Sequence, residues 1–124
     1  MKKLKKILIV EDEVALLEIL KEKLVNNSFE VVVAKNGEEG LEKAAQKDVD
    51  LILLDIVMPR MDGLTMLKHL RQIRRVNTPV IVLTNLGSQD DAKAALAVGA
   101  NDFLIKADHS LKEVVEKVTK ILDK

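Results

Sequence analysis

Five short apolar runs recur along the chain, and their alternation with helix-like segments restricts the folds open to it. The runs are KKILIV, EVVVA, DLILL, TPVIVL and NDFLI. Between them, apolar residues return with the period of an α-helix. The middle runs are apolar on both faces, which is typical of parallel strands covered by helices on both sides. The alternation therefore predicts parallel strands joined by right-handed helical crossovers.

The helical segments complete a repeated strand–helix pattern. We expect the first helix from about Glu13 to Asn26, the second after Asn36, the third after a cap at Asp62, the fourth from about Ser88 to Val98, and the fifth along the apolar stripe that begins at Leu111. This order predicts a doubly wound (βα)5 three-layer sandwich, with a five-stranded parallel sheet in the order 2-1-3-4-5. The length of 124 residues suits one domain, which we expect to span residues 1–124.

Composition narrows the classes of function. The chain has no cysteine, so it has neither disulfides nor thiolate metal sites. Its 20 basic and 20 acidic residues balance, and its only aromatic residues are two phenylalanines, which argues against direct binding of nucleic acid. The opening MKKLKKILIV is too short for a signal peptide, and no apolar run is long enough to span a membrane. We expect a soluble, cytoplasmic protein without membrane insertion.

Polar residues follow four of the five predicted strands. Glu11 and Asp12 follow the first strand, Asp55 the third, Thr84 ends the fourth, and Lys106 ends the fifth. Ligands of open α/β sheets bind beyond the carboxyl ends of the strands. In the order 2-1-3-4-5 the first and third strands are neighbours, so their three carboxylates should lie within a few ångströms of one another.

Three adjacent carboxylates repel unless a cation joins them. Oxygen ligands favour magnesium, manganese or calcium over zinc, and a small acidic rim with few protein ligands suits magnesium, with manganese possible. A carboxylate, a metal ion, the Lys106 ammonium and the Thr84 hydroxyl can together stabilise a phosphoryl group in transfer. A carboxylate can then hold that group as an acyl phosphate.

Four motifs in this order resemble the receiver domain of the two-component response-regulator family, of the single-domain chemotaxis-regulator kind. They are VED, LLDIVMPRMDG, VLTN and NDFLIK, and the resemblance covers the whole chain. It implies that Asp55 accepts a phosphoryl group in a magnesium-dependent reaction. It further implies that Glu11 and Asp12 form the acidic pair, with Asp12 binding the metal directly, and that Val57 lends its backbone carbonyl to the metal.

The resemblance also implies a switch. Thr84 and Lys106 match the hydroxyl and the lysine that contact the phosphate, and Phe103 matches the aromatic that turns inward when the hydroxyl is engaged. The implied partners are a sensor histidine kinase or a histidine phosphotransfer protein, and a downstream protein that reads the face of helix 4, strand 5 and helix 5. A monomer or weak homodimer is expected, acting as a phosphoacceptor regulator rather than as an enzyme.

The sequence departs from the family pattern at three places. Ala107 follows Lys106 where the family usually has proline after a cis bond; because a cis bond to a non-proline costs about 2.5–4 kcal/mol, we expect either a trans bond with a shifted loop or a strained cis bond. Asn85 replaces a small residue and should narrow access to Asp55. Val57 and Leu86 are apolar and cannot orient a hydrolytic water, which predicts a long-lived phosphoryl group.

Three other functions remain to be compared with the signalling switch. The alternative is a degenerate receiver that acts as a phosphorylation-independent interaction module, which the residues Asn85 and Ala107 favour but the intact acidic set opposes. A flavodoxin-like cofactor protein needs a glycine- and hydroxyl-rich phosphate loop, whereas the loop after the first strand reads EDEV. A phosphatase would need an acid at position 57, which is valine.

Overall fold

The computed structural model describes residues 4–46, 48–58, 60–85 and 89–122. Its elements are β1 (Lys6–Val10), α1 (Val14–Asn26), β2 (Glu30–Ala34), α2 (Gly37–Ala44), β3 (Leu51–Leu54), α3 (Gly63–Gln72), β4 (Val80–Thr84), α4 (Gln89–Ala97), β5 (Asp102–Ile105), a 3₁₀ turn (Lys106–Asp108) and α5 (Leu111–Leu122). The strands form one parallel sheet in the order β2-β1-β3-β4-β5. The predicted fold class and strand order are confirmed.

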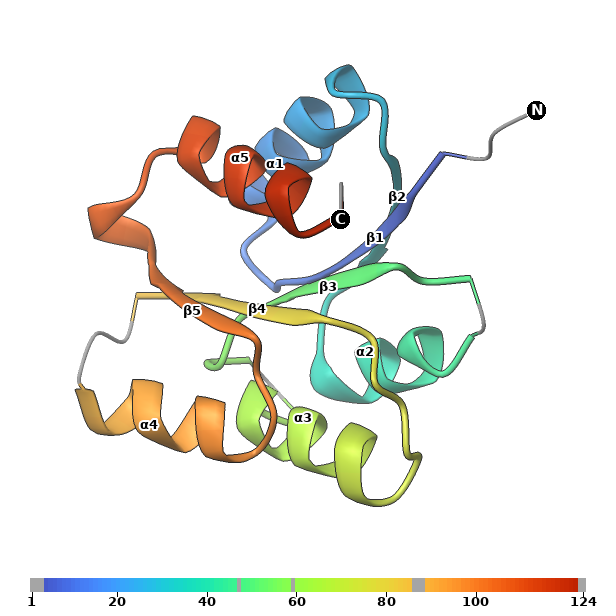
Figure 1. The fold of residues 1–124 in the computed structure, drawn as a ribbon, viewed down its shortest axis with the longest axis vertical. Helices are drawn as coiled ribbons and strands as arrows, with labels where there is room; N and C mark the ends of the chain where they lie inside the picture. Colours follow the sequence, from blue (N-terminus) through green and yellow to red (C-terminus); the bar gives the residue numbers. More distant parts are fainter. Residues whose placement is uncertain (1–3, 47, 59, 86–88, 123–124) are drawn as a thin grey trace.

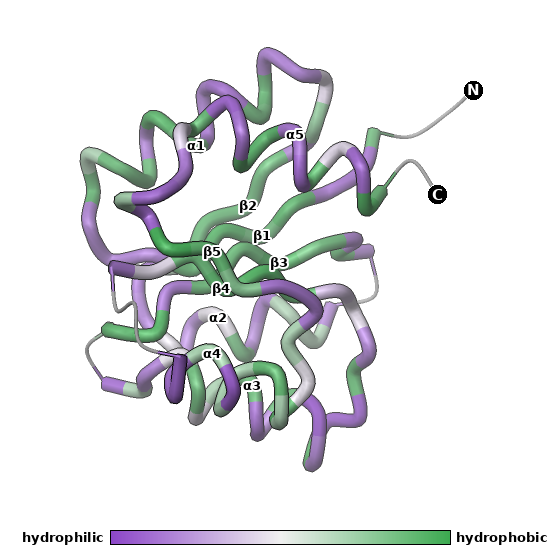
Figure 2. Tube along the Cα trace, turned by 60° about the vertical axis from the view of Figure 1, so that its left-hand side comes forward, coloured by the Kyte–Doolittle hydropathy of each residue, from purple (hydrophilic) through white to green (hydrophobic). Residues whose placement is uncertain are grey.

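The molecule has three layers. Helices α1 and α5 cover one face of the sheet, and α2, α3 and α4 cover the other (Figure 1). Figure 2 shows the mainly apolar strands between helices in which hydrophilic and hydrophobic residues alternate. Among the described residues, no helix combines the length and the apolar character needed to cross a membrane.

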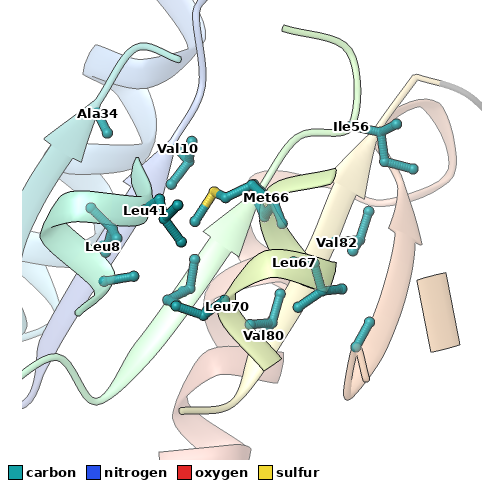
Figure 3. Packing of buried hydrophobic residues seen from close by; sticks show 14 of the residues in the cluster. Leu8, Val10, Ala34, Leu41, Ile56, Met66, Leu67, Leu70, Val80 and Val82 are labelled. Carbon is teal, nitrogen blue, oxygen red and sulfur yellow. The ribbon is translucent and has the colours of Figure 1, made fainter. Parts of the chain in front are cut away.

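Alternation along each strand divides the core into two clusters. Leu8 and Val10 of β1 point toward α2 and α3, whereas Ile7 and Ile9 point toward α1 and α5. This follows from the two-residue period of side chains in a strand. On the α2–α3 side the strands pack against an apolar row that includes Met66, Leu67 and Leu70 (Figure 3). Both faces of the central strands are therefore buried, as their sequence predicts.

Side-chain caps fix where three of the helices begin. Asn36 accepts a hydrogen bond from the Glu39 amide at 2.8 Å, and Asp62 accepts one from the Thr65 amide at 2.8 Å. Ser110 and Glu113 exchange reciprocal bonds in a capping box at the start of α5. Helix α1 spans Val14–Asn26 with Glu13 as its N-cap, as expected for a helix from about Glu13 to Asn26, but Glu13 makes no side-chain cap. The expected start of α4 at Ser88 lies outside the described residues.

Candidate functional site

The acidic residues meet where β1 and β3 end. The strands pair in parallel with Val10 opposite Leu54, and the Asp55 amide donates to the Val10 carbonyl at 3.0 Å. The residues after Val10 and Leu54 therefore emerge side by side. One carboxylate oxygen from each of Glu11, Asp12 and Asp55 lies within 4.8 Å of the other two. The predicted juxtaposition of the three carboxylates is present.

Lys106 places a cation among them. Its Nζ donates to Glu11 Oε1 at 2.9 Å and to Asp55 Oδ2 at 3.1 Å. The described residues contain no cis peptide bond, so the bond to Ala107 is trans, and the chain turns into the 3₁₀ segment directly after β5. Of the two backbone outcomes considered for this loop, the trans one occurs, and the lysine still reaches Asp55.

Burial sets the electrostatics of this group. The Glu11 and Asp55 side chains are only 4% and 8% exposed. Burial raises the pKa of Glu11, the Lys106 hydrogen bond opposes that rise, and the Asp55 charge adds to it. Burial also disfavours the charged form of Lys106, but its hydrogen bond to Glu11 and the charge of Asp55 outweigh this and raise its pKa. The protonation of Glu11 and of Lys106 therefore depends on the charged groups beside them.

The donor set fits a hard divalent cation. The carboxylate oxygens of Glu11, Asp12 and Asp55 are the ligands that Mg²⁺ and Mn²⁺ prefer. Asp12 is solvent-exposed, whereas Glu11 already accepts from Lys106 and, through Oε2, from the Glu13 amide at 3.1 Å. The exposed carboxylate is therefore the one open to a metal entering from solvent, in line with the direct role expected of Asp12.

The remaining predicted residues, Thr84 and Phe103, lie on β4 and β5. Thr84 is fully buried at the end of β4, opposite Ile105, which precedes Lys106. Phe103, on β5, lies opposite Val82 of β4. Its side chain is partly buried and packs against the core cluster on the side of α2, α3 and α4. These positions place a hydroxyl on β4, the strand next to β3, and an aromatic ring on β5, one strand further from β3. Their switching roles stay predictions.

Two positions flank the mouth of the site. Val57 is 57% exposed, and its amide donates to Asp55 Oδ1 at 3.3 Å. Asn85 is exposed directly after Thr84. Leu86, the other apolar residue expected to leave the hydrolytic water unoriented, lies outside the described residues.

The contact of Gly63 with the site was not predicted from the sequence. A Cβ built on Gly63 would lie 2.2 Å from the Asp55 carbonyl oxygen and 2.8 Å from the Ile56 Cα. The Gly63 amide also donates to the Ile56 carbonyl at 2.8 Å. The start of α3 is thus held against the backbone of Asp55, which only a glycine permits. The motif DG, seven and eight residues beyond Asp55, was the available signal, but the contact itself forms only in the tertiary structure.

Three carboxylates and a lysine lie together at the carboxyl edge of a doubly wound α/β sheet. This combination of fold and site defines the chain as a candidate metal- and phosphate-binding domain. The model of the family "Response regulator receiver domain" matches residues 7–119. The chain belongs to this family, whose members act in two-component signalling.

Its curated relatives include both short and long proteins. The chemotaxis protein CheY of Bacillus subtilis is 38% identical over 119 residues, covering 95% of this chain and 98% of the relative. The transcriptional regulatory protein CpxR of Escherichia coli K12 is 42% identical over 117 residues, covering 94% of this chain and 49% of the relative. The chain spans about half the length of CpxR and of several other relatives it matches.

Solved structures agree with the fold. A CheY-like receiver domain from Methanospirillum hungatei JF-1 gives a TM-score of 0.89 at 31% identity, covering 98% of this chain and 95% of that one. A CheX–CheY–BeF3–Mg²⁺ complex from Borrelia burgdorferi gives 0.87 at 30% identity, covering 97% and 90%.

Proposed function

We propose that the chain is a phosphoacceptor switch in which Asp55 takes a phosphoryl group from the phosphohistidine of a sensor kinase or phosphotransfer protein. The observation that carries this proposal is the Lys106 ammonium, 3.1 Å from Asp55 Oδ2 and 2.9 Å from Glu11 Oε1, beside three clustered carboxylates. A fixed cation at the carboxylate is placed to stabilise negative charge that develops on a transferring phosphoryl group.

Magnesium, with manganese as a substitute, is the proposed cofactor. Asp12 and Asp55 would hold it, with Glu11 and the Val57 carbonyl as further ligands. The related CheY from Borrelia burgdorferi, solved with Mg²⁺ and BeF3, supports this assignment. When bound, the metal would neutralise carboxylate charge and polarise phosphoryl oxygens.

The chain's own residues would carry the transfer. An Asp55 carboxylate oxygen bonds to phosphorus as the bond from phosphorus to the histidine nitrogen breaks, and the electron pair returns to the imidazole. Lys106 already donates to Asp55 Oδ2 and would follow the phosphoryl oxygens. The low exposure of Asp55, about one-twelfth of its side chain, limits water around the reacting oxygen.

The signal would then pass to a protein partner. Thr84 would be drawn toward the phosphoryl group, with Phe103 turning inward and the α4–β5–α5 face adopting a second arrangement. Helix α4 suits such a change because its only fully buried described residue is Ala95, so little apolar surface anchors it. We place this switch in the cytoplasm, where a kinase could reach it, as a regulator rather than as a classical enzyme.

One labelling experiment tests the proposal. The protein is incubated with phosphoramidate, with and without Mg²⁺, and any added phosphate is located by mass spectrometry. We expect magnesium-dependent labelling of Asp55 that is lost in Asp55→Asn and kept in Asp62→Asn, a matched control at the exposed cap of α3. Equal absence of label in wild type and Asp55→Asn would support the phosphorylation-independent interaction module instead.

A further inference from the structure

The first turn of α2 touches the loop that follows Asp55. A Cβ built on Gly37, the first residue of α2, would lie 2.1 Å from the Met61 carbonyl oxygen and 2.8 Å from the Met61 Cβ. Both atoms belong to the loop between β3 and α3, which also carries Val57. The main chain of α2 is therefore in direct contact with the main chain of this loop.

Local preference does not account for glycine at this position. Gly37 does not have the positive φ that favours glycine, since Gly99 is the only described glycine with one. Within a helix, alanine is favoured over glycine by about 1 kcal/mol. The reason for glycine is thus the close approach to Met61, where a side chain has no room.

The start of α2 is itself rigidly held. Asn36 caps the helix by accepting from the Glu39 amide, and the Lys35 amide donates to Glu39 Oε1 at 2.7 Å. An ion pair of 2.7 Å between Arg60 Nη2 and Glu38 Oε1 joins the same helix turn to the loop a second time. The loop therefore contacts the capped first turn of α2 at two points.

The other side of the loop is equally confined. Gly63 packs against the Asp55 carbonyl oxygen, and its amide bonds to the Ile56 carbonyl. Val57 is tied back to Asp55 Oδ1 through its amide. Because these contacts hold the loop at Asp55, we expect a displacement at Met61 to move the backbone around Asp55 and Val57.

We propose that the N-terminus of α2 braces the loop after Asp55, and that Gly37 is a positioning residue for the metal site. This inference rests on the proposed function, because it assumes that Asp55 and the Val57 carbonyl help to bind Mg²⁺. Loss of such outer support of a metal site lowers metal affinity by about 10- to 100-fold.

The test compares two glycines of the same helix. Gly37→Ala meets the loop backbone, whereas Gly40→Ala meets only side-chain atoms, those of Val10 and Met66, at 2.9–3.0 Å. Because the chain has no tryptophan or tyrosine, Mg²⁺ titrations are followed by backbone-amide NMR, with urea unfolding measured in parallel. We expect Gly37→Ala to weaken Mg²⁺ binding about tenfold. Gly40→Ala should stay within about twofold of wild type even where it costs more stability.

The outcomes separate the two proposals. A wild-type protein without a Mg²⁺ response overturns the proposed function. Mg²⁺ binding by wild type that Gly37→Ala leaves unchanged, or weakens no more than Gly40→Ala, overturns the brace.

If Gly37→Ala does not fold, Arg60→Gln decides the matter. Removal of a nearby positive charge should by Coulomb's law tighten Mg²⁺ binding, whereas loss of the brace should weaken it. Arg74→Gln, which breaks the pair with Glu42 on the same helix but away from the loop, is the matched control. Binding by Arg60→Gln that is weaker than by Arg74→Gln supports the brace, and equal or tighter binding overturns it.

Discussion

Replacing Lys106 by methionine removes the cation of the acidic pocket while keeping a side chain of similar length. The Lys106 side chain is 12% exposed, and its Nζ contacts two carboxylates that are buried more deeply still. The variant leaves Glu11, Asp12 and Asp55 together without a compensating charge. Such a change should destabilise the fold mainly through the carboxylates that remain.

The structure sets the size of the effect. Removing one partner of a buried ion pair lowers the free energy of unfolding by about 3–5 kcal/mol. Because the Lys106 side chain keeps some contact with water, we expect a loss at the lower end of this range, about 3 kcal/mol. Lys117, which pairs with Asp102 at 3.3 Å on the surface, provides a control, because exposed pairs contribute about 0–1 kcal/mol. Mg²⁺ should reduce the difference in free energy of unfolding between wild type and Lys106→Met by more than about 1 kcal/mol, because a divalent cation replaces the lost charge.

The assay is urea unfolding followed by far-ultraviolet circular dichroism at neutral pH. Wild type, Lys106→Met and Lys117→Met are each measured without metal and at saturating Mg²⁺. A Lys106→Met deficit no larger than that of Lys117→Met would refute the electrostatic account of the pocket. A deficit that Mg²⁺ leaves unchanged would refute the assignment of the carboxylates as metal ligands.

Three further predictions follow from single contacts. The phosphoryl group of the wild type should persist for minutes in Mg²⁺, and Val57→Glu should shorten its lifetime about tenfold by orienting water; decay of the wild type within seconds would contradict this. We expect Asn85→Ala to speed labelling by phosphoramidate, because a smaller side chain directly after Thr84 should leave more room at Asp55; an unchanged rate would show that access is not limiting. Hydrogen bonds from Ser110 lower the pKa of Glu113, so the stability it gives is present above the unfolded pKa and lost as pH falls through the folded one. Glu113→Gln should therefore unfold at lower urea than wild type at about pH 7 and match it at about pH 2; a pH-independent difference would count against the capping box.

The sequence predicted the fold through its periodicity. Runs such as LILL that are apolar at every position need cover on both faces, which excludes a strand exposed to water. Helix starts at Asn36 and Asp62 were predictable because the side chain that caps a helix is encoded next to it. The start of the first helix was predicted at about Glu13, and Glu13 is the N-cap of α1, although it makes no side-chain cap.

By itself the sequence determined which polar groups stand at strand ends, and hence that Glu11, Asp12 and Asp55 would meet once β1 and β3 were neighbours. It did not determine which atoms pair, because the contact of Lys106 with Glu11 joins residues 95 positions apart. The trans bond before Ala107 and the contact of Gly37 with Met61 were likewise decided in the tertiary structure. The physical reason is that strand position is encoded locally by hydrophobic pattern, whereas ångström-scale approach depends on how whole elements pack.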